Sequence, residues 1–205
     1  METFGTPFSI VGCTMKKKEK KMYTLLLLLI YLAFISLGLP DSLLGSAWPV
    51  MHKAFQVPLS YAGLVTMIIS GGTICSSLMS ERLTKKFGTQ IVTVFSVMLT
   101  AIALFGFSTA SAFWMLCLWA IPYGLGAGAI DAALNNYVAL HYNSRHMSWL
   151  HCFWGLGTII SPYVMSYALI TSVWQNGYRM VSFIQIGITS VSYTHLRAHE
   201  TSQDL

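Results

Sequence analysis

The chain has 205 residues, of which 55% are hydrophobic and 9% are charged. A soluble domain carries roughly 25% charged residues, so this composition excludes an ordinary soluble protein and predicts an all-α membrane protein. The net charge of +5 would fit a nucleic-acid partner, but most of the basic residues flank predicted spans. We therefore expect the lipid bilayer, and not a nucleic acid, as the partner.

Six apolar segments follow one another along the chain. They cover residues 23–50, 59–79, 91–107, 113–140, 149–170 and 180–191. The first five are long enough to cross a hydrocarbon layer of about 30 Å, which takes roughly 17 to 25 helical residues. The sixth is too short to cross, so we expect a six-helix bundle with a truncated sixth helix. Because lipid offers no hydrogen bonds to the backbone, each segment must be helical.

We expect three parts in the chain. Residues 1–22 form a basic N-terminal segment, in which 1–14 read as a spurious stretch upstream of a second start at Met15. Residues 23–191 form the transmembrane bundle. Residues 192–205 form a polar tail that resembles a translated vector junction, which predicts an artefactual end and a missing C-terminal half.

The basic residues predict the orientation of the bundle. Nine of them lie before the first span, after the second or after the fourth: Lys16, Lys17, Lys18, Lys20, Lys21, Arg82, Lys85, Lys86 and Arg145. Only Lys53 and Arg179 lie at the opposite ends of spans. Positive residues accumulate on the cytoplasmic side, so we expect a multi-pass protein of the plasma (inner) membrane with a cytoplasmic N-terminus.

Two carboxylates, Asp41 and Asp131, lie within apolar segments, whereas the other five acidic residues lie in tails or polar connections. A charge at bilayer depth costs roughly 2.5 to 3.5 kcal/mol on insertion scales, so it usually binds a substrate, relays protons or pairs with another helix. If both helices are straight, the two carboxylates differ in depth by roughly 12 Å. We therefore expect one in each half of the membrane and no direct sharing of a proton.

The fourth span combines small and polar residues on one helical face. Gly124, Gly128, Asp131 and Asn135 follow a 4-3-4 spacing, and Asn136 lies beside them. The two glycines form a GxxxG pair that lets another helix approach closely. The carboxylate and carboxamides predict a substrate or proton site, and the alternative is that they only hold helices together.

The first and fifth spans carry further candidates. Pro40 lacks a backbone donor, which predicts a kink beside Asp41, and interrupted helices often line transporter binding sites. The alternative places Asp41 at the outer interface. His151 can titrate near physiological pH. Trp154 offers an aromatic platform for a sugar ring, as do Trp48 and Tyr123, although core packing explains such aromatics equally well.

No metal or other cofactor is expected. His141, His146 and His151 recur every five residues, which spreads them around a helix. His195 and His199 have helical i,i+4 spacing but no third ligand in view. The four cysteines are scattered singly.

These residues resemble the N-terminal half of a major facilitator superfamily transporter, most closely the fucose permease group of sugar/proton symporters. The likeness covers about residues 22–191. In that group an acidic residue in the first span and an acidic-x-x-x-Asn pattern in the fourth are functional, which assigns these roles to Asp41, Asp131 and Asn135. The family fold implies twelve spans in two halves around a central cavity, so the C-terminal six-helix half is an expected partner.

The chain also departs from family patterns. The loop motif GxxxDRxGR is represented by Glu81 and Arg82, with Gly88 at a longer offset. Ala120 stands where many proton-coupled members have an arginine. Of the fifth-span motif of drug antiporters, only Gly157 and Pro162 remain.

The sequence thus predicts a secondary transporter and not an enzyme. Its substrates are expected to be a small polar solute, a sugar, together with protons. The alternatives are a drug or metabolite exporter of the same superfamily, or an inactive truncated fragment. A membrane-embedded enzyme would need ligands that converge at one depth, which these spacings do not provide.

Overall fold

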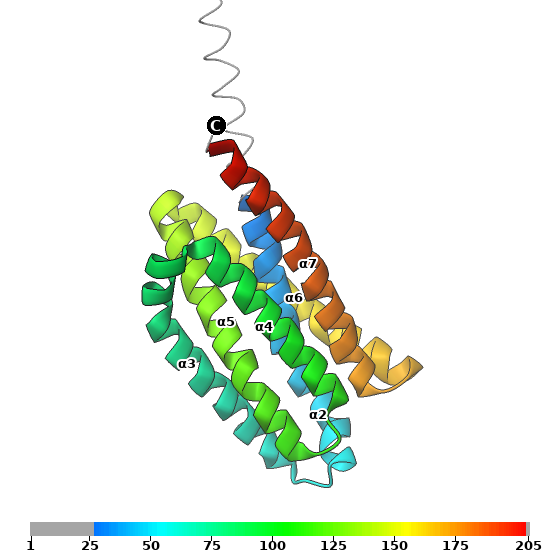
Figure 1. Cartoon of the computed structure of the whole chain (residues 1–205). Coiled ribbons are helices and arrows are strands. Elements are labelled where there is room, and N and C mark those ends of the chain that lie inside the picture. The colour runs from blue at the N-terminus through cyan, green and yellow to red at the C-terminus, as the bar shows by residue number, and fades with distance from the viewer. Residues whose placement is uncertain (1–26, 204–205) are drawn as a thin grey trace, which may run out of the picture.

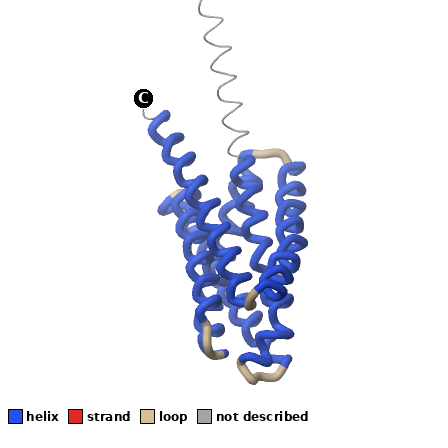
Figure 2. Tube along the Cα trace, turned by 90° about the vertical axis from the view of Figure 1, so that its right-hand side faces the viewer, coloured by secondary structure: helices blue, strands red, loops and turns tan. Residues whose placement is uncertain are grey.

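In the computed structural model of this chain, residues 27–203 are described, and the side chains of 191–203 are not. The described part consists of helices and short connections without a strand (Figures 1 and 2). The predicted basic segment 1–22 lies outside the described residues. The predicted all-α fold is confirmed.

Five helices are long and apolar enough to cross a membrane, as the sequence predicts. The helical residues 27–41 and α2 (Leu43–Ala54) make the first span. A short 3-10 helix, η1 (Leu59–Tyr61), leads into the next helices. These are α3 (Ala62–Phe87), α4 (Thr89–Thr109), α5 (Phe113–His141), α6 (Ser144–Thr171) and α7 (Trp174–Gln203). Helix α5 lies between α3 and α4, and α7 packs against α4 and α6 (Figure 1).

The last helix is longer than its apolar segment. The sequence predicts a short apolar stretch over 180–191, whereas α7 has 30 residues and continues through part of the predicted polar tail. Helix formation needs only backbone hydrogen bonds, and no proline interrupts this stretch, so polarity alone does not end the helix. The polar residues lower its hydropathy, and α7 is not among the five candidate spans.

The first span has one turn residue directly after Asp41, at the place where the sequence predicts a kink. Residues 27–41 are helical, Ser42 is a turn, and α2 begins at Leu43. Pro40 has no N–H to donate to the preceding turn, so the helix is weakest at this point.

The predicted cytoplasmic loop motif is mostly helical. Glu81 and Arg82 lie inside α3, where Glu81 pairs with Lys85 one turn later at 2.6 Å. Only Gly88 lies between α3 and α4, with a φ of 82° that few other residues adopt. The assignment of Glu81 and Arg82 to a loop was wrong, because good helix formers and an i,i+4 ion pair continue the helix up to this glycine.

The GxxxG pair of α5 packs tightly against α3, as predicted. A Cβ atom at Gly124 would lie against the carbonyl oxygen of Ile69, and one at Gly128 against that of Thr73. Hydroxyl groups of α3 donate to carbonyl oxygens of α5 along the same contact; the donors are Thr73, Ser76, Ser77 and Ser80. Close backbone approach and these hydrogen bonds together fix α5 on α3.

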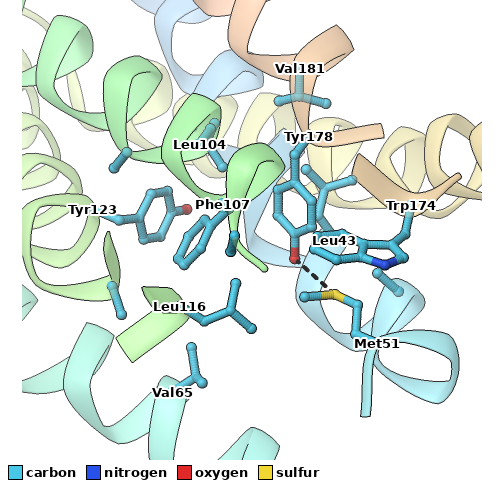
Figure 3. Close-up of a cluster of buried hydrophobic side chains, with 14 of the residues drawn as sticks. Leu43, Met51, Val65, Leu104, Phe107, Leu116, Tyr123, Trp174, Tyr178 and Val181 are labelled. Atoms are coloured by element: carbon cyan, nitrogen blue, oxygen red, sulfur yellow. Dashed lines mark hydrogen bonds between the residues drawn. The ribbon is translucent and has the colours of Figure 1, made fainter. Parts of the chain in front are cut away.

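The main hydrophobic core fills the end of the bundle that carries η1 (Figure 3). Tyr178 of α7 is 2% exposed and packs against Phe107 and Trp174, and its hydroxyl donates to the sulfur of Met51. In the same view Tyr123 of α5 lies beside Phe107. This core holds α2, α4, α5 and α7 together.

Helices α3 and α6 have the smallest buried shares of the five spans, 11% and 22% of their most apolar windows. Their exposed side chains are largely apolar and include Met67, Ile74 and Leu78 of α3 and Ile159 and Tyr163 of α6. These two helices therefore present apolar surface to their surroundings, whether lipid or protein.

Candidate functional site

A cavity of about 320 Å³ brings most of the predicted site residues together. Its walls come from the first span, α3, α5 and α6. The lining residues are Leu37, Asp41, Ile69, Thr73, Tyr123, Ala127, Asp131, His151 and Trp154. Both carboxylates therefore line one space, and the predicted difference in their depth stays a prediction.

The carboxylate of Asp41 is held by two donors from other helices. The Tyr123 hydroxyl of α5 donates to Oδ1 at 3.0 Å, and the Trp154 indole N–H of α6 donates to Oδ2 at 2.9 Å. Each carboxylate oxygen thus accepts a hydrogen bond from an uncharged group. Two uncharged donors from two other helices thus fix the orientation of the Asp41 carboxylate.

The carboxylate of Asp131 is oriented by its own helix. The Asn135 amide donates to Oδ1 of Asp131 at 2.9 Å, one turn along α5. His151 of α6 lines the same cavity and makes an edge contact with the ring of Phe34. The cavity thus contains two acidic groups and one imidazole, which can exchange protons, and an exposed indole, which can stack on a ring.

A second cavity of about 360 Å³ lies on the other side of Asp41. It shares Asp41, Ile69 and Tyr123 with the first cavity, and otherwise its lining is largely apolar. The remaining lining residues are Pro40, Leu44, Gly45, Ala62, Thr66, Ser70, Leu104, Phe107 and Tyr178. Asp41 and Tyr123 consequently form part of the wall between two spaces. We call the first space, with Asp131, the polar cavity and the second the apolar cavity.

Two predicted site residues do not line either cavity. Asn135 contacts the polar cavity only through Asp131, and its Oδ1 atom is buried without a hydrogen-bond partner in the described part of the chain. Asn136 is exposed on α5 and takes no part in the cavity wall. Adjacent residues differ by about 100° around a helix, so the two carboxamides point in different directions.

Tyr123 belongs to the site, although the sequence offered it only as an aromatic platform. A signal for this role was present, because Tyr123, Ala127 and Asp131 follow one another at i,i+4 spacing and all line the polar cavity. Thr73 was missed because nothing in α3 marks the face that meets α5. Within the described residues, no group of three His, Cys, Asp or Glu side chains is placed to hold a metal ion.

Residues 30–200 match the family model described as Major Facilitator Superfamily. The chain belongs to the major facilitator superfamily. Members of this superfamily are membrane transporters and not enzymes, and the helical bundle with its five apolar spans is consistent with a half of the superfamily fold. The protein is thus a multi-pass membrane protein.

Two known proteins are similar to parts of the chain. The yeast protein "Bypass of stop codon protein 6" from Saccharomyces cerevisiae is 24% identical over 156 residues, which is 75% of this chain and 31% of the relative. The "Glucose/mannose transporter GlcP" from Bacillus subtilis is 22% identical over 148 residues, or 70% of this chain and 36% of the relative. The chain matches about a third of the length of each.

Proposed function

We propose that this chain is the N-terminal half of a secondary transporter that takes up a small polar solute, a sugar, together with protons. Two carboxylates and an imidazole in the wall of one cavity, lined by the first span, α3, α5 and α6, are the observation that carries this proposal. Such groups are expensive in a membrane and mark substrate or proton pathways. The resemblance to the fucose permease group and the printed name of the Bacillus relative support a sugar as the solute.

In this proposal Asp131 binds the solute or a proton. A carboxylate accepts hydrogen bonds from sugar hydroxyls, and Asn135 holds its Oδ1 atom in place. His151 contributes a second group that can bind a proton. Asp41, with its two neutral donors, is the second protonation site.

The C-terminal six-helix half is the proposed partner. The least buried spans, α3 and α6, are the ones whose apolar faces it would cover. Superfamily transporters are built from two such halves, with the substrate site at their interface. The proposed setting is the plasma membrane with a cytoplasmic N-terminus, which follows from the basic residues near the ends of α3 and α5.

The decisive experiment uses Asp131→Asn in the two-half transporter, with uptake of radiolabelled monosaccharides into membrane vesicles. Proton-driven accumulation should be abolished, because the amide cannot bind a proton reversibly, while wild-type protein accumulates sugar under an inward acid gradient. Asn136→Ala is the matched control on the same helix and should accumulate sugar normally. Undiminished uphill uptake by Asp131→Asn would remove Asp131 from the mechanism. Substrate efflux without uptake by the wild-type protein would identify an exporter instead.

A further inference from the structure

The two donors on Asp41 differ in how firmly they are packed. The Tyr123 ring is 4% exposed and lies against Phe107 in the hydrophobic core. The Trp154 ring is 40% exposed and borders the polar cavity. Tyr123 is therefore fixed by its packing. Within the described residues, the Trp154 ring makes one polar contact, its hydrogen bond to Asp41.

The two donors also differ in chemistry. A tyrosine hydroxyl both donates and accepts, so it can accept a hydrogen bond from a protonated Asp41. An indole N–H only donates, so a proton on Oδ2 would place two donors face to face. A proton on Oδ1 would leave Trp154 with a neutral acceptor, which binds roughly half as strongly as a charged one. In either case the contact with Trp154 weakens, whereas the Tyr123 hydroxyl keeps a hydrogen bond either by donating or by accepting.

The backbone around Trp154 is less free to move than the Trp154 side chain. Its carbonyl oxygen packs against Gly38, where even a Cβ atom would clash, and Gly157 packs against Ile35 in the same way. The first span and α6 are therefore in close backbone contact on either side of the ring. A change at Asp41 can be answered by rotation of the Trp154 side chain more easily than by movement of α6.

We propose that Trp154 is a positioning residue that links protonation of Asp41 to the polar cavity. With Asp41 ionised, its N–H is tethered to Oδ2 and the ring is held at the wall. With Asp41 protonated, the tether is released and the ring turns into the polar cavity, where its face stacks on the apolar face of a sugar ring. This inference rests on the proposed function, and it names the residue through which the proton and the solute interact.

Other titratable groups face the same space and must be separated from Asp41. Asp131 of α5 and His151 of α6 line the polar cavity. Tyr123 of α5 and Tyr178 of α7 line the apolar cavity together with Asp41. A pH-dependent signal from Trp154 is therefore assigned to Asp41 only if it depends on Asp41 and not on its neighbours.

The first test measures tryptophan fluorescence of the purified chain in detergent between pH 5 and pH 8. The chain has six tryptophans, so the Trp154 signal is the difference between wild type and Trp154→Phe. This difference should change with pH, and the change should be absent when both proteins also carry Asp41→Asn. Trp149→Phe is the matched control, because Trp149 is also exposed on α6, at 49% against 40% for Trp154, and lines neither cavity. The difference between wild type and Trp149→Phe should not vary with pH.

Several results would overturn the inference. One is a Trp154 signal that does not vary with pH. Another is a signal that persists with Asp41→Asn but is lost with His151→Gln, since the titrating group would then be the imidazole. If Asp41→Asn does not fold, Tyr123→Phe replaces it. Removing this donor from the carboxylate should shift the pH midpoint of the Trp154 fluorescence signal. An unchanged midpoint would also refute the proposed control of Trp154 by Asp41.

The second test separates this inference from the proposed function. In vesicles with the two-half transporter, Trp154→Phe should reduce the accumulation ratio by about fivefold or more, the lower range of coupling factors. Sugar counterflow at equal pH should fall less than the accumulation ratio, because phenylalanine keeps an aromatic face for the sugar but has no N–H for Asp41. Equal loss of both activities would make Trp154 a simple binding residue and reject its role in coupling. Absence of accumulation by wild type would reject the proposed function, and the fluorescence result would still decide whether Asp41 controls Trp154.

Discussion

Gly128→Ala should destabilise the bundle by forcing α3 and α5 apart. The new Cβ would overlap the carbonyl oxygen of Thr73 on α3, which is a backbone atom and cannot rotate away. The two helices would have to separate by about 1 Å to restore ordinary contact distances. Gly124, one turn earlier on α5, lies equally close to the backbone of α3.

The cost follows from two contributions. Forcing extra volume into a packed contact costs about 1 to 3 kcal/mol. The hydroxyl donors Thr73, Ser77 and Ser80 lie 3.2 to 3.3 Å from their acceptors, so a further separation breaks these hydrogen bonds. Each such bond between membrane helices contributes about 0.6 kcal/mol. Alanine offsets part of this cost because it is the better helix former, so we expect Gly128→Ala to lower the free energy of unfolding by about 2 to 4 kcal/mol.

The assay is equilibrium unfolding of the purified chain in mixed micelles, followed by circular dichroism. Gly71→Ala on α3 is the matched control, because a Cβ at Gly71 meets no atom within 4 Å. Alanine is the better helix former by about 0.8 to 1 kcal/mol, so this control should be neutral or stabilising. Equal stability of Gly128→Ala and wild type, or equal losses in both variants, would refute the proposed close contact.

Three further predictions concern single hydrogen bonds. Gln185→Leu removes a buried side chain that donates to a backbone carbonyl of the first span, and unfolding free energy should fall by about 1 to 3 kcal/mol. Trp48→Phe removes an indole donor to a carbonyl of η1 and should lower the free energy of unfolding by about 1 kcal/mol in the same assay. Trp114→Phe, at an exposed position, should leave it unchanged, and equal effects of the two variants would contradict the role of this hydrogen bond. Asn135→Ala should raise the KM for solute by about tenfold, or about 1.4 kcal/mol, because the carboxylate of Asp131 is no longer oriented. The same rise in KM for Asn136→Ala would contradict that reasoning.

Much of the fold could be predicted from local sequence. Apolar length alone located the five spans, because a bilayer leaves a long apolar segment no alternative to a helix. The spacing of Gly124 and Gly128 predicted close packing, and Pro40 predicted the interruption beside Asp41. The helical end of α3 around Glu81 was not foreseen, since polar residues were taken for a loop although their propensity is helical.

The candidate site was only partly predictable. Asp41, Asp131, His151 and Trp154 stood out because charged or polar groups are rare in apolar segments, and all four line the polar cavity. The predicted difference in depth between the two carboxylates did not reveal that they line one cavity, because a cavity can extend along the helices. Asn136 was included because it is next to Asn135, but adjacency in sequence is not adjacency on a helix.

By itself, the sequence determined that this protein is a helical membrane bundle with acidic groups inside it, because hydrophobicity and helix periodicity act over short stretches of chain. Only the tertiary structure decided that Tyr123 and Trp154 bind opposite oxygens of Asp41, since they approach it from helices 82 and 113 residues away in sequence. Such contacts depend on how helices cross and rotate against one another. That arrangement comes from the packing of the whole bundle, which no local pattern encodes.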